Sequence, residues 1–187
     1  FHSCTAFNQP ISFDTKEVTD MNGMFQGCSN FNQYVYFDTI EAVENMSGMF
    51  QGCTVFNQDI SDWTTNQVTN MSDMFHGCNA FNQDISEWHT NNVTNMNRMF
   101  QGCTVFEQNI RSWTVEVNTS LTDMFNGATY LTSKYSRVSG FGTTPTSVFF
   151  NITPTKLTND TIRTDLYDCT TNTAHPQFLI RTTNSTL

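Results

Sequence analysis

Histidines, cysteines and carboxylates are the side chains of this chain that could bind a metal ion or take part in catalysis. The four histidines, His2, His76, His89 and His175, do not have the spacing by which neighbouring ligands hold one metal ion. The chain also has no nucleophile elbow, no phosphate-binding loop and no catalytic zinc motif. We therefore predict that the protein is not an enzyme and that it has no catalytic or cofactor-binding residues.

Five of the six cysteines recur at a nearly constant interval. They are Cys4, Cys28, Cys53, Cys78 and Cys103, and Cys169 lies far beyond them. If the intervals stack, neighbouring Cα atoms come within about 5 Å, which a disulfide accepts, although parallel side chains need distortion to bond. Two readings stay open, namely buried free thiols and disulfides such as Cys28 with Cys53 and Cys78 with Cys103. Zinc is disfavoured because no Cys-x-x-Cys occurs.

Metal binding by other side chains has little support. Asp59 and Asp84 share one position of the interval and could hold calcium together, but Tyr34 and Asn109 interrupt the column. The nine methionines recur on a regular apolar face, where a thioether usually fills the core. We predict no cofactor, and calcium is the one ion that these carboxylates leave open.

Seven N-glycosylation sequons occur, beginning at Asn45, Asn70, Asn92, Asn118, Asn151, Asn159 and Asn184. Asn45 and Asn70 lie where a helix cap is expected, so we favour the other five as glycan sites, provided that the source is a eukaryote or its virus. The sequons favour a secreted glycoprotein.

The elements that position these residues are predicted by an internal repeat. Met-Phe pairs recur every 25 residues, and their aromatic members are Phe25, Phe50, Phe75, Phe100 and Phe125. A second aromatic column contains Trp63, Trp88 and Trp113. A fixed period of this length predicts a solenoid, in which equivalent residues stack about 4.8 Å apart and form ladders in the core.

Within one repeat, Met71, Met74, Phe75 and Cys78 have the i, i+3, i+4, i+7 spacing of one helical face, which predicts a short helix. Short parallel strands are predicted from Asp84 to Trp88 and through Val93. The predicted fold is thus an α/β solenoid like a leucine-rich repeat, with about five coils over residues 1–128. The Asn-Gln pairs that follow a ladder Phe are predicted to satisfy turn backbone groups rather than to bind glycans.

The repeat signature V-T-N-M-S-x-M-F-x-G-C-x-x-F-N-Q-x-I-S-x-W resembles that of the BspA-like surface proteins, whose unit is also described as the mycoplasma lipoprotein DUF285 repeat. The resemblance covers about residues 1–128. It implies an extracellular, non-catalytic domain used in adhesion or matrix contact, located outside the cell or on a cell or virion surface.

Composition limits the partners. Residues 1–128 carry a net charge of −11 and residues 129–187 carry +2, so no basic patch favours nucleic acid or an anionic membrane. A solvated surface explains this acidity better than a specific cation-binding face does. No stretch is long and apolar enough to span a membrane. The chain opens inside a repeat, which we interpret as a mature or trimmed product or as part of something longer.

Residues 129–187 contain sixteen threonines and two strand-like stretches, 147–152 and 177–181. We predict a small Thr-rich β cap or assembly module there, and the run from Thr143 to Ser147 is either a loop or an O-glycosylated segment.

Two functions remain open for the whole chain. One is a binding module for a protein or glycan, with an exposed aromatic patch at variable positions such as Tyr34, Tyr36 and Phe37. The other is a structural subunit that assembles head-to-tail with other copies into a glycosylated filament or coat.

Overall fold

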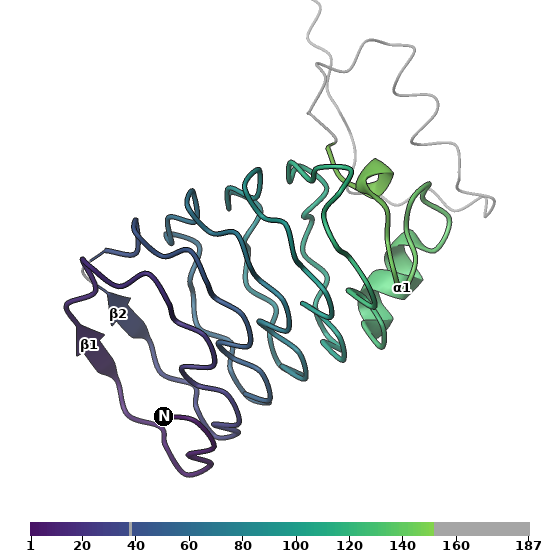
Figure 1. Ribbon diagram of the computed structural model, residues 1–187. Coiled ribbons are helices and arrows are strands. Elements are labelled where there is room, and N and C mark those ends of the chain that lie inside the picture. Colours follow the sequence, from purple (N-terminus) through teal and green to yellow (C-terminus); the bar gives the residue numbers. More distant parts are fainter. Residues whose placement is uncertain (38, 152–187) are drawn as a thin grey trace, which may run out of the picture. The chain divides into compact units, whose positions relative to one another are not determined.

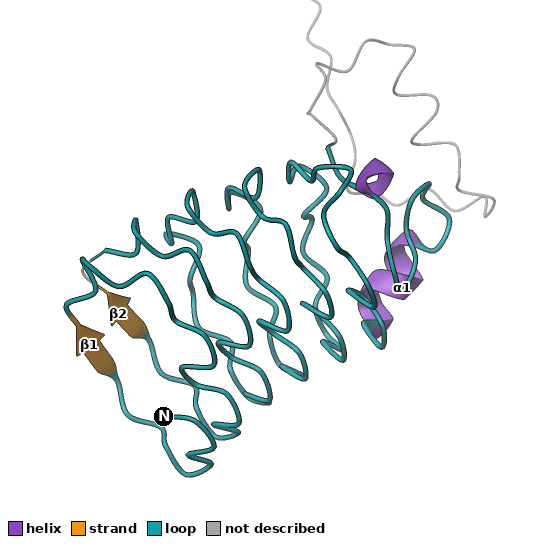
Figure 2. Cartoon of the chain, viewed as in Figure 1, coloured by secondary structure: helices purple, strands orange, loops and turns teal. Residues whose placement is uncertain are grey.

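The computed structural model describes residues 1–37 and 39–151. It contains strands β1 (Ile11–Phe13) and β2 (Val35–Phe37), helix α1 (Thr129–Tyr135) and a short 3-10 helix, η1 (Ser147–Phe149). Most other residues form turns and loops, which run as successive coils that lie side by side (Figure 1 and Figure 2). We call residues 1–128 the repeat stack. The described residues after it belong to the same compact unit, which runs from Phe1 to Thr153.

Backbone hydrogen bonds join each coil of the repeat stack to the next. The Phe25 N–H donates to the Met49 oxygen at 2.9 Å, and one coil later the Phe50 N–H donates to the Met74 oxygen at 3.0 Å. Isolated parallel bridges connect a further column, made up of Asp20, Asn45, Asn70, Asn95 and Ser120. Residues about 25 apart in the sequence are therefore neighbours in a narrow parallel ladder.

The short helix predicted in each repeat is wrong, because the described repeats form turns in this segment. A helix needs each N–H to bond the carbonyl four residues back. Here the Met24 N–H closes a tight turn on the Met21 oxygen, whereas the Gly23 N–H donates to Ser47 in the next coil. Gly23 also has a φ of 59°, and its equivalent Asp73 has a φ of 57°, a left-handed conformation that interrupts a right-handed helix.

The predicted strand position is occupied by a strand only in the first two coils of the described chain. β1 and β2 pair in parallel, with Ile11 opposite Val35. In later coils the equivalent segment turns instead, because an aspartate or asparagine side chain closes it. The Ser86 N–H, for example, donates to Asp84 Oδ1 at 2.9 Å. The strand predicted from Asp84 to Trp88 is therefore wrong.

The described part of the C-terminal segment, residues 129–151, contains two short helices joined by turns, and no strand. α1 buries Leu131 and Tyr135, which are one helical turn apart. Of the strand predicted at 147–152, residues 147–149 form η1 instead, and residue 152 lies outside the described residues. Packing against the last coil outweighs the β-propensity of threonine here. None of the helices in residues 1–37 and 39–151 is long and apolar enough to cross a membrane. The strand predicted at 177–181 lies outside the described residues.

The core of the repeat stack is built from aromatic columns. The five predicted ladder phenylalanines are fully buried, and the ring centroids of Phe25 and Phe50 are 5.5 Å apart, with nearly parallel planes. A second column includes Phe31 and Phe56, whose centroids are 5.9 Å apart. Phe75 contacts both columns, since its centroid lies 4.0 Å from that of Phe81. Each buried ring stabilises the fold by roughly 1.5–3 kcal/mol, and its stacking adds to this.

We expect Phe75→Ala to lower the free energy of unfolding by about 3–5 kcal/mol, because the truncation leaves a cavity between stacked rings on both sides. Urea unfolding measures this change. Val117→Ala serves as the control, since Val117 is 80% exposed and its truncation should change stability by less than about 0.5 kcal/mol. An unchanged unfolding midpoint for Phe75→Ala would contradict this account of the core.

Candidate functional site

The consensus amides of the repeat are used inside the fold. The Asn57 N–H donates to Asn32 Oδ1 at 2.9 Å, and Gln58 Nε2 donates to the same oxygen. The same contacts recur one coil later, from Asn82 and Gln83 to Asn57 Oδ1. Because these side chains satisfy turn backbone groups from coil to coil, a functional surface is to be sought where repeats depart from the consensus.

The cysteines of the described chain are free thiols. They are Cys4, which is exposed, and Cys28, Cys53, Cys78 and Cys103, which are buried. The Cys53 thiol donates to the Phe25 oxygen at 3.0 Å and the Cys78 thiol donates to the Phe50 oxygen at 2.9 Å. Each of the four buried thiols points at a carbonyl of the preceding coil rather than at the next sulfur, and this geometry favours free thiols over disulfides in the column. Cys169 lies outside the described residues.

Burial also suppresses thiol chemistry in this column. It raises the pKa of Cys53 to about 12 and raises the pKa of Cys78 and Cys103 well above the ordinary value. The reactive species is the thiolate, so these side chains behave as small apolar residues.

We expect maleimide at pH 8 to label Cys4 in the native protein and to leave the four buried cysteines unlabelled until denaturant is added. Site-resolved mass spectrometry after digestion measures this. A disulfide between Cys28 and Cys53 in non-reduced native protein would contradict the thiol geometry.

The predicted glycan sites have different environments. Asn45 and Asn70 are half-buried, and their Oδ1 atoms accept from the backbone of Ser47 and Ser72. The bonds of the Asn151 side chain argue against a glycan there. Its Nδ2, the atom that would carry the sugar, donates to the Val115 oxygen at 2.9 Å, and its Oδ1 accepts from the Val115 N–H. The remaining described sequons are at Asn92, whose Nδ2 donates to the Asn66 oxygen at 2.7 Å, and at the exposed Asn118. Asn159 and Asn184 lie outside the described residues.

The carboxylates considered for calcium have local roles. Asp59 accepts from the Ser61 N–H at 3.0 Å, and this bond holds the pKa of its carboxyl below the usual value. Asp84 closes the same turn one coil later. Among the described residues, no three His, Cys, Asp or Glu side chains form a group that could hold a metal ion.

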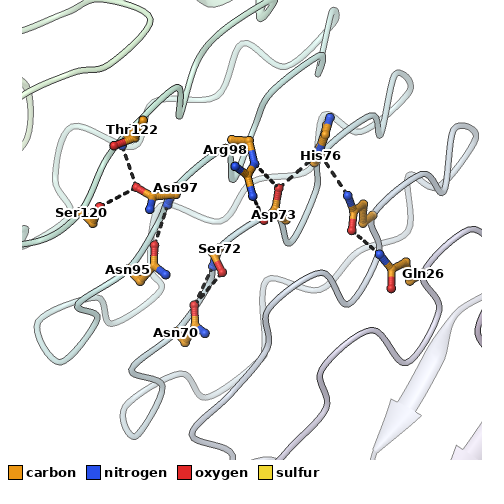
Figure 3. Close-up of polar contacts among 11 residues, drawn as sticks. Gln26, Asn70, Ser72, Asp73, His76, Asn95, Asn97, Arg98, Ser120 and Thr122 are labelled. Atoms are coloured by element: carbon orange, nitrogen blue, oxygen red, sulfur yellow. Dashed lines mark hydrogen bonds and ion pairs between the residues drawn. The ribbon is translucent and has the colours of Figure 1, made fainter.

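A charged cluster on the surface of the middle coils was not predicted from the sequence. Asp73 accepts from Arg98 Nε at 2.7 Å and from Arg98 Nη2 at 2.8 Å, and His76 Nδ1 lies 3.3 Å from the same carboxylate (Figure 3). Gln51 Nε2 lies 3.2 Å from His76 Nδ1 and so continues a column that starts at Gln26. Asp73 and Arg98 have opposite charge and stand 25 residues apart, which is the signal that could have revealed the pair.

Asp73 is electrostatically coupled to its neighbours. Burial by itself raises the pKa of its carboxyl, but the hydrogen bonds and charges of Arg98 and His76 outweigh burial and hold that pKa below its usual value. A carboxyl with a lowered folded-state pKa adds stability above its unfolded pKa of about 3.9, and this stability is lost as pH falls through the folded value.

We expect Asp73→Asn to lower the free energy of unfolding at pH 7 by up to about 1 kcal/mol, because Arg98 is 49% exposed and solvent screens the pair. The difference from the unsubstituted protein should shrink as the pH is lowered below about 3.9. Urea unfolding at a series of pH values measures it. Glu87→Gln is the control, because Glu87 carries an exposed carboxyl. If the loss of unfolding free energy in Asp73→Asn does not change with pH, the pair makes no ionic contribution to stability.

The largest departure from the consensus lies at β2. Tyr34 and Tyr36 are 45% and 52% exposed, where later repeats carry Asp, Asn, Ser or Arg. Phe37 is half-buried, and its ring centroid lies 5.5 Å from that of Trp63. A cavity of about 340 Å³ opens here, lined by these side chains together with Glu41, Asp62 and their neighbours. We call it the β2 cavity.

Trp63 differs from its two ladder partners at this cavity. Trp88 Nε1 donates to the Ile60 oxygen at 3.1 Å, and Trp113 Nε1 donates to the Ile85 oxygen at 3.0 Å. Trp63 forms no bond of this kind to residues 1–37 and 39–151, in which every fully buried side-chain nitrogen and oxygen has a partner. The β2 cavity therefore offers an aromatic wall and carboxylate acceptors, which are groups that can hold a ligand.

The sequence pattern of a protein family described as "Mycoplasma protein of unknown function, DUF285" matches residues 1–42 and 36–138. This match confirms the resemblance inferred from the repeat signature. No curated protein and no solved structure gave a significant match.

Proposed function

This chain belongs to the DUF285 family, and we propose that its repeats form a leucine-rich-repeat-like solenoid that acts without catalysis at a cell or virion surface, in adhesion through protein or glycan binding. The observation that carries the proposal is the contrast between consensus and variable residues. Consensus residues stack in the core or bond to the next coil, whereas variable residues place exposed Tyr34 and Tyr36 at the β2 cavity. Exposed aromatic side chains beside a cavity are typical anchors of a binding surface.

We expect the double substitution Tyr34→Asn and Tyr36→Ser to weaken adhesion at least about tenfold, because removing an aromatic anchor commonly costs more than 1 kcal/mol of binding free energy. Asn109 and Ser61 occupy the equivalent positions in other coils, so the fold should tolerate both changes. Binding of the immobilised protein to panels of matrix proteins and glycans measures the effect.

Tyr130→Ser is the matched control for this experiment. Tyr130 is 55% exposed on α1, far along the chain from β2, and its substitution should leave adhesion unchanged. If both variants bind as the unsubstituted protein does, the β2 cavity is not the adhesive site.

Head-to-tail assembly into a filament is the second candidate. It is favoured by an apolar cavity of about 400 Å³ in the first coils, lined by Phe13, Val18, Met21, Met24 and neighbouring polar residues. At the last coil, however, the Phe125 N–H already donates to the Thr143 oxygen of the same chain, so that edge is occupied. Sedimentation of concentrated protein tests assembly, and a monomer at every concentration would exclude it.

A further inference from the structure

The β2 cavity combines aromatic rings with negative charge. Tyr34, Tyr36 and Trp63 contribute rings, and Glu41 and Asp62 contribute carboxylates. No Lys, Arg or His is among the described residues that line it. An aromatic face attracts a cation through its quadrupole, and a carboxylate attracts it directly, so both kinds of side chain favour the same ligand charge.

The local potential at the cavity is negative. Burial, followed by the charges of Asp62 and Asp59, raises the pKa of the Tyr34 phenol above its ordinary value. The surrounding repeat stack strengthens this field over a longer range, because residues 1–128 carry a net charge of −11. A neutral sugar would cover these carboxylates without compensating their charge, which makes a glycan the less favourable occupant.

Within residues 1–37 and 39–151 the Trp63 indole N–H forms no bond like those of Trp88 and Trp113, and this favours a peptide over a free amine as the ligand. Trp88 and Trp113 donate to backbone carbonyl oxygens of the chain itself, whereas Trp63 lines the cavity, and its indole N–H can donate to a carbonyl that a ligand brings. A basic side chain attached to a peptide backbone supplies both a cation and such a carbonyl.

From these contacts we infer that the β2 cavity binds a lysine or arginine side chain of a partner protein, with Tyr34 and Tyr36 beside the cation and Glu41 and Asp62 pairing with it. The inference rests on the proposed function and names the chemistry of the partner. The partner of the adhesive surface is then a basic segment of a protein, which the acidic repeat stack attracts over long range.

The test is an NMR titration of the full chain with the peptide acetyl-Gly-Gly-Arg-Gly-Gly-amide. The matched probe replaces the arginine with citrulline, which has nearly the same shape and no charge. We expect the arginine peptide to shift the Trp63 indole resonance, assigned with a Trp63→Phe variant, and to bind at least tenfold more tightly than the citrulline peptide. Added salt should weaken the arginine complex.

The variant Glu41→Gln with Asp62→Asn should lower affinity for the arginine peptide at least tenfold. Its Trp88 and Trp113 indole resonances, which lie outside the cavity, should stay in place and so show that the fold is kept. Equal binding of the two peptides, or stronger binding of methyl glucoside, would overturn the inference. If adhesion requires Tyr34 and Tyr36 but the arginine peptide does not bind, the inference is overturned and the proposed function stands. Adhesion that needs neither tyrosine would overturn the proposed function.

Discussion

The alternation of hydrogen-bond direction in the Met-Phe segment is the constraint on which the rest of the structure depends. One N–H closes a tight turn within its own coil, and the next donates to the following coil, as Met24 and Phe25 do. Left-handed residues make this alternation possible, and Gly27, Gly52 and their equivalents repeat it with φ near 75°. The spacing of the coils, and with it the contact between stacked rings, follows from these bonds.

This backbone ladder determines what each side chain can do. Phe75 and Cys78 lie on the inner side of their coil. Their side chains can therefore only pack in the core or, for the thiol, bond to a backbone carbonyl. Asn57 stands at a turn, where its backbone N–H donates to Asn32 Oδ1 in the preceding coil and its side-chain Oδ1 accepts from the Asn82 N–H in the next coil. Because consensus residues are used internally, differences among repeats can accumulate on the surface without disturbing the stack.

Two such differences stand out, and they have different physical characters. The pair of Asp73 and Arg98 joins adjacent coils by a bidentate ionic contact and is best explained as local stabilisation. The β2 cavity instead gathers aromatic rings and the carboxylates of Glu41 and Asp62 around an opening in the surface. Only the second arrangement has groups that a partner could satisfy, which is why we assign binding to it.

The sequence by itself determined the family, the repeat period and the inner face of each coil, because a residue that recurs every 25 positions on a stacked chain must keep one environment. It did not determine the backbone of the Met-Phe segment. A helix and a spiral of turns both place Met71, Met74 and Phe75 on one side, and only hydrogen bonds to the next coil distinguish them. The helix over Thr129–Tyr135 was likewise decided by packing that overrides threonine's local preference. Contacts between adjacent coils set three further features, namely the direction of each thiol, the pairing of Asp73 with Arg98 and the opening beside β2. These contacts form only in the tertiary structure.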